Sequence, residues 1–111
     1  MKILDCTLRD GGYVNNWHFG ENVIESILKS LISSGIDIIE LGFLTNESTF
    51  SADYTKFNSL NELKNFNQFK SAHQKFVAMI NYGAYDLDNL PEKKHTFVDG
   101  LRLAFHKKDL F

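Results

Sequence analysis

The sequence predicts an α/β protein built on a parallel sheet. Short apolar runs that suit strands alternate with stretches whose apolar residues recur every three to four positions, as on one face of a helix. Strands that alternate with helices in this way form parallel sheets through right-handed crossovers. The predicted order is β-α-β-α-β-α-β. We expect residues 1–111 to form one domain with no internal boundary.

The first predicted strand covers Lys2–Leu8 and has an unusual polar face. Leu4, Cys6 and Leu8 alternate with a second set of side chains, which consists of Ile3, Asp5, Thr7 and Arg9. A polar face is unexpected in a buried strand unless that face lines a site. Gly11 and Gly12 are predicted to end the strand, and Val14–Phe19 to form a loop.

The next two elements carry the strongest patterns. A helix is predicted over Glu21–Ser34, because its apolar residues fall on one face of a 3.6-residue period. Gly35 suits the end of that helix. The second strand, Ile36–Phe43, is almost entirely apolar, which is typical of a strand covered on both faces. One charge, Glu40, interrupts it near its carboxyl end.

The rest of the chain completes the alternation. Residues 47–74 are too long for a plain loop, and spaced apolar residues predict a helix over Leu60–His73. A third strand is predicted over Lys75–Asn81, a short helix over Leu87–Lys93, and a fourth strand over Gly100–Phe105.

Composition excludes several classes of protein. The formal net charge is −2 and 23% of the residues are charged, so we expect binding neither to nucleic acid nor to an anionic membrane. No apolar run reaches the length of a membrane span. The single cysteine, Cys6, excludes an intrachain disulfide, and the expected location is the cytoplasm.

Three motifs resemble one enzyme family. They are LDCTLRDGGY at residues 4–13, IIELGF at 38–43 and GLRLAFH at 100–106. They resemble the first, second and fourth strands of the metal-dependent superfamily that contains hydroxymethylglutaryl-CoA lyase, isopropylmalate synthase and 4-hydroxy-2-oxovalerate aldolase. That family has a (β/α)8 barrel fold, which needs roughly 250 residues. The resemblance therefore implies that the chain is the N-terminal half of a TIM barrel, with four parallel strands and intervening helices.

The resemblance also implies roles for particular residues, because the active sites of such barrels lie at the carboxyl ends of the strands. Asp10 is implied as a ligand of Mn²⁺ or Mg²⁺. Arg9 would stabilise developing negative charge, and Glu40 would orient Arg9 or the substrate. Tyr13 and His18 are the candidates for acid/base catalysis. The expected substrate-binding residues are Asn81, Arg102 and His106.

Simpler interpretations of the same charges stay open. Arg9 and Asp10 are also consistent with a structural ion pair at the end of a strand. Glu40 is also consistent with a buried charge that Arg9 or Arg102 neutralises, and such a pairing is compatible with a catalytic role.

The implied function is a divalent-metal-dependent aldolase that cleaves a 4-hydroxy-2-oxo acid into pyruvate and an aldehyde. The sequence lacks the His-x-His pair that completes the family's metal site, so we expect the chain alone to be incomplete and inactive. Two alternatives remain. One is an acetyl-CoA-dependent 2-oxo acid synthase of the same superfamily, although synthases usually place Glu or Gln after T-L-R-D-G. The other is a non-catalytic half-barrel that serves as an assembly module.

The expected partners follow from the half-barrel and from the family. Four strands leave two sheet edges open, so we expect self-association or pairing with a C-terminal half. The expected small-molecule partner is a 2-oxo acid. An aldehyde dehydrogenase that takes the aldehyde product is a partner that the family resemblance implies.

Overall fold

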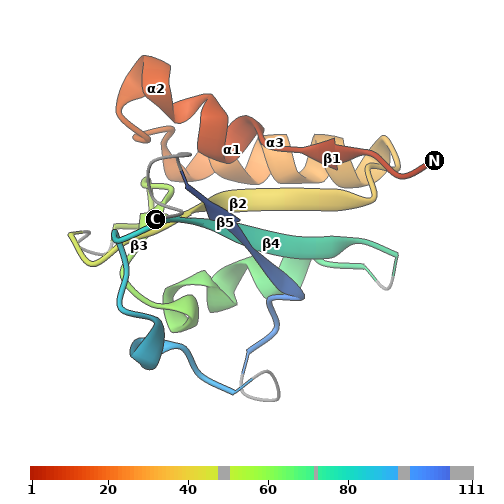
Figure 1. The fold of residues 1–111 in the computed structure, drawn as a ribbon. Helices are drawn as coiled ribbons and strands as arrows, with labels where there is room; N and C mark the ends of the chain where they lie inside the picture. Colours follow the sequence, from red (N-terminus) through yellow and green to blue (C-terminus); the bar gives the residue numbers. More distant parts are fainter. Residues whose placement is uncertain (48–50, 72, 93–95, 106–111) are drawn as a thin grey trace.

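The fold, seen in a computed structural model, is an open parallel sheet with helices (Figure 1). The structure describes residues 1–47, 51–71, 73–92 and 96–105. The elements in chain order are β1 (Leu4–Asp5), α1 (Thr7–Asp10), α2 (Gly12–Asn15), α3 (Glu21–Ser33), β2 (Ile38–Leu44), β3 (Lys56–Phe57), the 3₁₀ helix η1 (Leu60–Phe69), β4 (Lys75–Asn81), the 3₁₀ turn η2 (Leu87–Asn89) and β5 (Gly100–Ala104).

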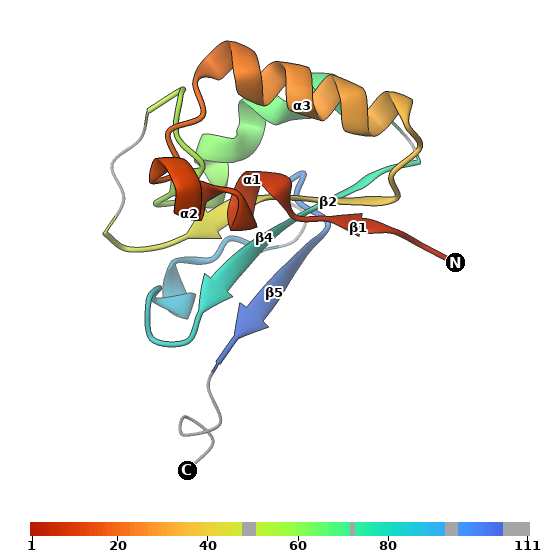
Figure 2. The same ribbon diagram turned by 90° about the horizontal axis from the view of Figure 1, so that it is seen from above.

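The sheet has the parallel topology that the sequence predicts. Within the described residues its order is β1-β2-β4-β5, with β3 paired to β2, and each of these strand pairings is parallel. Seen from above, α3 and η1 lie on the same side of the sheet (Figure 2). Crossover helices that cover one face of a parallel sheet are the arrangement of a barrel wall.

The hydrophobic core lies between that face of the sheet and the helices. Ile39 and Leu41 of β2 are fully buried, together with Leu28 of α3 and Leu63 of η1. Successive residues of a strand point to opposite faces. Glu40, between Ile39 and Leu41, therefore points to the face that α3 and η1 leave uncovered, and it is nevertheless fully buried.

The prediction for the N-terminal strand is wrong beyond Asp5. β1 contains only Leu4–Asp5, and Thr7–Asp10 forms one helical turn instead of extending the strand. The Asp5 carboxylate accepts hydrogen bonds from the Thr7 backbone N–H at 2.9 Å and from the Thr7 hydroxyl at 3.0 Å. Such local side-chain bonds compete with strand pairing and favour a turn. The alternation of apolar residues does not reveal this competition.

The two glycines that follow do not break a strand either. Gly11 and Gly12 have helical surroundings, and α2 occupies part of the predicted loop over Val14–Phe19. A Cβ atom on Gly12 would lie 1.9 Å from the Cδ1 atom of Trp17. The absent side chain therefore lets the indole ring pack directly on the backbone.

The remaining predicted helices and strands differ from the structure mainly in where some of them begin or end. The helix predicted over Glu21–Ser34 is confirmed as α3, and the strand predicted over Lys75–Asn81 is confirmed as β4 with the same ends. The other two later strands are confirmed as β2 and β5 with shifted ends. The predicted helix Leu60–His73 is a 3₁₀ helix that ends at Phe69, in a segment rich in asparagine, which is a weak helix former. Of the predicted helix Leu87–Lys93, only η2 is helical up to residue 92, and Lys93 lies outside the described residues.

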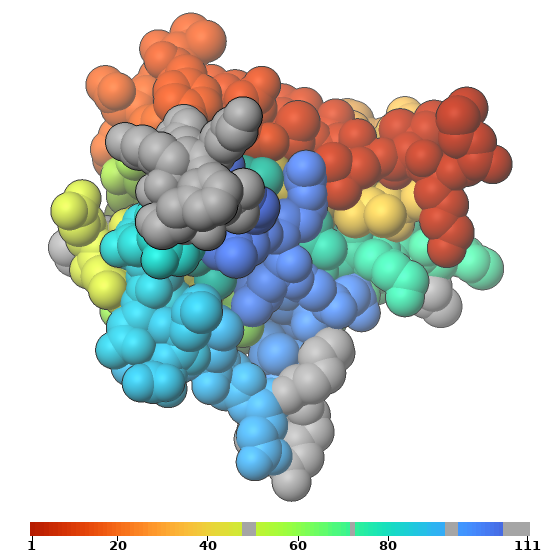
Figure 3. Space-filling model, in the orientation of Figure 1, coloured from red at the N-terminus to blue at the C-terminus, as the bar shows by residue number. Residues whose placement is uncertain are grey.

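The edge strand β5 is largely exposed. Leu101 is 40% exposed, Leu103 is 52% exposed and Phe105, which follows the strand, is 52% exposed. In the space-filling view the blue residues of this segment lie on the surface of the front face (Figure 3). Strand β1 at the other end of the path is only two residues long. No helix within the described ranges is long and apolar enough to cross a membrane.

A β-bulge in β2 brings β3 into the sheet. The register between β2 and β4 shifts between Glu40 and Phe43. Gly42, inside this bulge, has a φ of 150°, and a Cβ atom there would lie 2.0 Å from the Thr55 carbonyl oxygen. That carbonyl accepts a hydrogen bond from the Phe43 N–H at 3.0 Å. Only glycine allows this close approach without strain.

Replacing Gly42 by alanine should therefore lower the free energy of unfolding by about 3 kcal/mol, through backbone strain and overlap with Thr55. Urea unfolding followed by circular dichroism measures this change. Gly100→Ala is the matched control, because its new Cβ would make an ordinary 3.6 Å contact with Val77. A Gly42→Ala variant as stable as Gly100→Ala would contradict the role assigned to the bulge.

Candidate functional site

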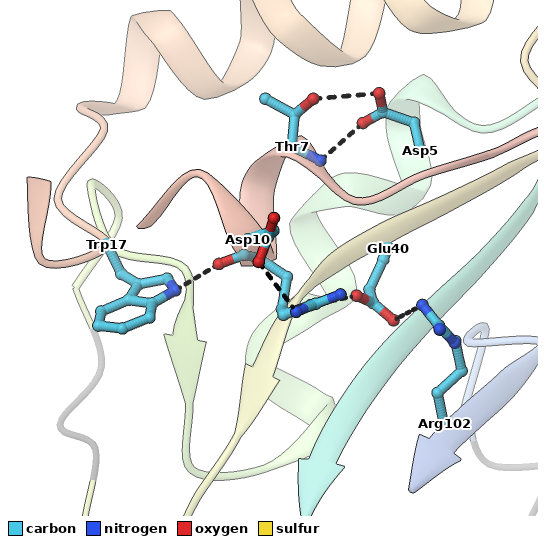
Figure 4. A network of polar contacts seen from close by, with 7 residues as sticks. Asp5, Thr7, Asp10, Trp17, Glu40 and Arg102 are labelled. Atoms are coloured by element: carbon cyan, nitrogen blue, oxygen red, sulfur yellow. Dashed lines mark hydrogen bonds and ion pairs between the residues drawn. The ribbon is translucent and has the colours of Figure 1, made fainter. Parts of the chain in front are cut away.

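Three charged residues from distant parts of the sequence meet on the uncovered face of the sheet. The Arg9 Nε atom donates a hydrogen bond to Glu40 Oε1 at 2.6 Å, and the Arg102 Nη1 atom donates one to Glu40 Oε2 at 2.8 Å. The Glu40 carboxylate is fully buried between them, and Figure 4 shows it pointing toward Arg102. The structure thus brings together three of the residues that the sequence predicts for the site.

The two arginines explain how a carboxylate is tolerated at this depth. A buried ionised carboxylate is costly unless charged hydrogen-bond partners satisfy its oxygens. Each Glu40 oxygen has its own guanidinium partner. The interpretation of Glu40 as a neutralised buried charge is therefore confirmed, and both candidate arginines take part. The same bonds fix the orientation of the Arg9 side chain, which is only 15% exposed.

Arg9 has further contacts that hold it in place. Its Nη1 atom lies 3.3 Å from Asp10 Oδ1, and its Cζ atom lies 5.8 Å from the ring centroid of Phe43. Its backbone carbonyl accepts a 2.6 Å hydrogen bond from Trp17 Nε1. Burial lowers the pKa of Arg9, but the hydrogen bond and the charge of Glu40 outweigh burial and raise that pKa above its ordinary value. Arg9 is therefore a permanent cation.

A cavity of ≈ 270 Å³ lies beside this network at the carboxyl ends of β2 and β4. Tyr13 and Asn81, which the sequence predicts for the site, both contribute to its wall. Phe43 forms part of the same wall and also contacts Arg9. Among the residues that the structure describes, the lining consists of Tyr13, Trp17, Phe43, Leu44, Thr45, Glu47, Lys56, Asn81 and Ala84.

Lys56 is a cavity residue that the sequence did not indicate. Its Nζ atom lies 3.8 Å from the Trp17 ring centroid and 6.0 Å from that of Phe43. A cation over an indole face is attracted by the ring quadrupole. Lys56 sits in β3, a strand of two residues, which is too short to produce a recognisable alternation. The sequence feature that could have indicated this strand is Gly42, because a glycine there allows β3 to approach β2 closely.

The candidate histidine that the structure describes, His18, is not in the lining of this cavity. His18 Nδ1 lies 3.4 Å from Asp53 Oδ2, and the His18 ring stacks on Tyr54 at 4.4 Å between centroids. The pKa of Asp53 is lowered, mainly by a hydrogen bond from Ser51 and also by His18, although desolvation acts in the opposite direction. His18 therefore belongs to a surface cluster with the 51–54 segment. His106 lies outside the described residues.

The metal site that the sequence resemblance implies is present only in part. The Asp10 side chain is 64% exposed and one of its oxygens faces Arg9. Its carboxylate suits one oxygen ligand of a hard divalent cation. Across the described ranges no group of three or more His, Cys, Asp or Glu side chains is placed to hold a metal ion. Asp10 thus fits as a single ligand, and the described residues do not form a complete metal centre.

The open parallel sheet, with charged residues gathered at the carboxyl ends of its strands, matches the N-terminal half of an aldolase domain. No family model matches the sequence. The chain is similar to "4-hydroxy-2-oxovalerate aldolase 6" of Rhodococcus jostii (strain RHA1), with 25% identity over 108 residues. It also matches the crystal structure of the N-terminal domain of a presumed aldolase from Bacteroides vulgatus, with a TM-score of 0.75 and 28% identity.

These matches cover almost all of this chain and about a third of each relative. The aligned region is 96% of this chain and 30% of the Rhodococcus protein, and 99% of this chain and 37% of the Bacteroides chain. The resemblance to aldolases that the sequence motifs indicate is confirmed, and so is the N-terminal half of an aldolase domain as the fold. The activity of the whole protein remains a matter for proposal.

Removing the charge of Glu40 should destabilise the chain strongly. Glu40→Gln leaves two arginines facing a neutral amide, and we expect the free energy of unfolding to fall by about 3 kcal/mol. Urea unfolding provides the measurement. Glu25→Gln is the matched control, because Glu25 pairs with Lys29 on the exposed face of α3 and its loss should change stability by less than about 0.5 kcal/mol. Equal stability losses in the two variants would refute the structural weight given to Glu40.

Proposed function

We propose that this chain is part of an aldolase that cleaves a 4-hydroxy-2-oxo acid into pyruvate and an aldehyde. The observation that carries the proposal is the fixed position of the Arg9 guanidinium beside the carboxyl ends of the strands. Its Nε atom donates a 2.6 Å hydrogen bond to the buried Glu40 carboxylate, which holds it there. The similarity to a 4-hydroxy-2-oxovalerate aldolase supports the choice of substrate class.

The chemistry of this cleavage needs a fixed positive charge. When the carbon–carbon bond breaks, its electron pair moves onto the neighbouring oxo group and forms an enolate. A cation already oriented toward that oxygen stabilises the charge without rearranging in the transition state. Arg9 suits this role because its pKa is raised, its side chain is mostly buried, and Glu40 and Asp10 hold the guanidinium from two sides.

A proton must also leave the 4-hydroxyl group as the bond breaks. Tyr13 is our first candidate to accept or relay this proton. It lines the cavity together with Phe43, and Phe43 contacts Arg9. Its ring packs edge-on against Trp17 at 4.8 Å between centroids. His18 is the second candidate, and its pairing with Asp53 places it outside the cavity wall. We assign Asn81 and Arg102 to substrate binding, and Arg102 also positions Glu40.

Asp10 is our candidate for a ligand of Mn²⁺ or Mg²⁺. A divalent cation bound there would supply positive charge to orient and polarise the oxo acid. One exposed carboxylate provides a single oxygen donor, so the remaining ligands must come from outside the described part of this chain. Arg9 lies between Asp10 and Glu40 and keeps the two carboxylates in fixed positions.

We also propose that another part of the protein, or a second copy, covers the open edges of the sheet. The exposed apolar residues at β5, Leu101, Leu103 and Phe105, support this proposal, because an uncovered strand edge with apolar side chains favours association. The relatives' length is consistent with it, since each is about three times as long as the matched region.

Arg9→Lys in the whole protein tests the proposed reaction. Lysine keeps the charge but cannot reproduce the Nε contact with Glu40, so we expect kcat to fall about 100-fold while KM changes by less than about threefold. Pyruvate released from 4-hydroxy-2-oxopentanoate in the presence of Mn²⁺ is measured with a lactate dehydrogenase couple. Lys64→Met, on the exposed face of η1, is the control and should retain full activity.

Two results would contradict the proposal. An Arg9→Lys variant with unchanged kcat would remove Arg9 from the reaction. Release of CoA thiol from acetyl-CoA and a 2-oxo acid, with no pyruvate formed from the hydroxy acid, would identify a synthase instead of an aldolase.

A further inference from the structure

We infer that the cavity between Trp17 and Asn81 is an anion-binding subsite, in which Lys56 holds a second negatively charged group of the substrate. The substrate would then be a dianion, with one charge near Arg9 and the other near Lys56. This inference rests on the proposed function, because Arg9 is taken to face the 2-oxo acid end of the substrate.

The first observation is the placement of Lys56. Its backbone is fixed by the pairing of β3 with β2, in which Lys56 is opposite Phe43. Its ammonium group lies 3.8 Å above the Trp17 ring, and the side chain is partly buried. The indole in turn is held by its 2.6 Å hydrogen bond to the Arg9 carbonyl. The charge of Lys56 is therefore held at a defined position in the cavity wall.

The second observation is that two cations flank a single aromatic ring. The Arg9 Cζ atom lies 5.8 Å from the Phe43 centroid, and Lys56 Nζ lies 6.0 Å from the same centroid. A ligand that extends past Phe43 from Arg9 into the cavity thus passes from one fixed positive charge to another. A monoanion would meet only one of them, whereas a dianion is complementary to both.

The third observation concerns the other polar groups of the cavity. Thr45, Asn81 and Tyr13 supply neutral hydrogen-bonding groups to the wall. Within the described part of that lining Glu47 is the acidic residue, and it is exposed, whereas Lys56 is partly buried against the rings. Water and salt screen a partly buried charge less than an exposed one, so the positive charge of Lys56 can act on a group held in the cavity. A volume of ≈ 270 Å³ suits a short organic acid.

Trp17 provides a direct measurement, because it is the only tryptophan in the sequence. We would titrate the protein with three acids whose main chains each contain six atoms, and follow tryptophan fluorescence emission. Adipate carries two carboxylates, 5-phosphonopentanoate carries a carboxylate and a phosphonate, and hexanoate carries one carboxylate. We expect at least one of the dianions to bind at least about tenfold more tightly than hexanoate, because it gains a charge-assisted contact. The tighter dianion identifies the second group as carboxylate or phosphate-like.

Variants separate an anion site from simple packing of Lys56 on Trp17. Lys56→Met should reduce dianion affinity to the level of hexanoate, and Lys56→Arg should retain it within about threefold, because arginine keeps the charge. Lys64→Met, a change to an exposed lysine outside the cavity, should leave affinity unchanged. Circular dichroism establishes that each variant folds. If Lys56→Met does not fold, the comparison of the three acids on the unaltered chain decides the question.

The inference is overturned if the dianions bind no better than hexanoate, if none of the acids binds, or if Lys56→Met binds dianions as well as the unaltered chain. These titrations require no turnover. If the dianions bind no more tightly than hexanoate, the anion-binding subsite is refuted and the proposed role of Arg9 is unaffected. Conversely, a dianion preference in a protein that releases pyruvate neither from 4-hydroxy-2-oxopentanoate nor from the dicarboxylate 4-hydroxy-2-oxohexanedioate would retain the binding site and refute the aldolase.

Discussion

The buried carboxylate of Glu40 is the constraint on which the rest of this structure depends. A negative charge on the uncovered face of the sheet is tolerable only because Arg9 and Arg102 each satisfy one of its oxygens. That requirement connects α1, the middle of β2 and the exposed strand β5 at one point. It also makes Arg9 rigid and permanently charged, and these are the properties that an oxyanion-stabilising group needs. The structural role of this network is therefore compatible with the catalytic role that we propose for Arg9.

A second feature organises the surroundings of that network. The bulge at Gly42 lets β3 approach β2, and β3 places Lys56 over Trp17. Trp17 lies against Gly12 and donates to the carbonyl of Arg9, so the cavity wall and the charged network share a short stretch of backbone. The position of the cavity relative to Arg9 is thus determined by covalent connection as well as by packing.

Sequence patterns predict those parts of this molecule that depend on nearest neighbours and periodicity. The helix α3 follows from its apolar face, and β2 follows from an apolar run interrupted by one charge. The polar motif around Arg9 predicts a candidate site at the carboxyl ends of the strands, where the structure also places the cavity. The turn at Thr7–Asp10 was not predictable from alternation, because it depends on hydrogen bonds that the Asp5 carboxylate accepts from Thr7. Lys56 could not be assigned to the site, because its position requires the long-range pairing of a two-residue strand.

The spacing of the charged groups along the chain has a consequence for how the protein folds. Glu40 is separated from Arg9 by 31 residues and from Arg102 by 62 residues. Until β5 joins the sheet, the carboxylate has one of its two partners and its environment is incomplete. Contacts between residues far apart in sequence form late, because they close large loops. During synthesis we therefore expect the environment of Glu40 to be completed only after residue 102 is available to pair with it.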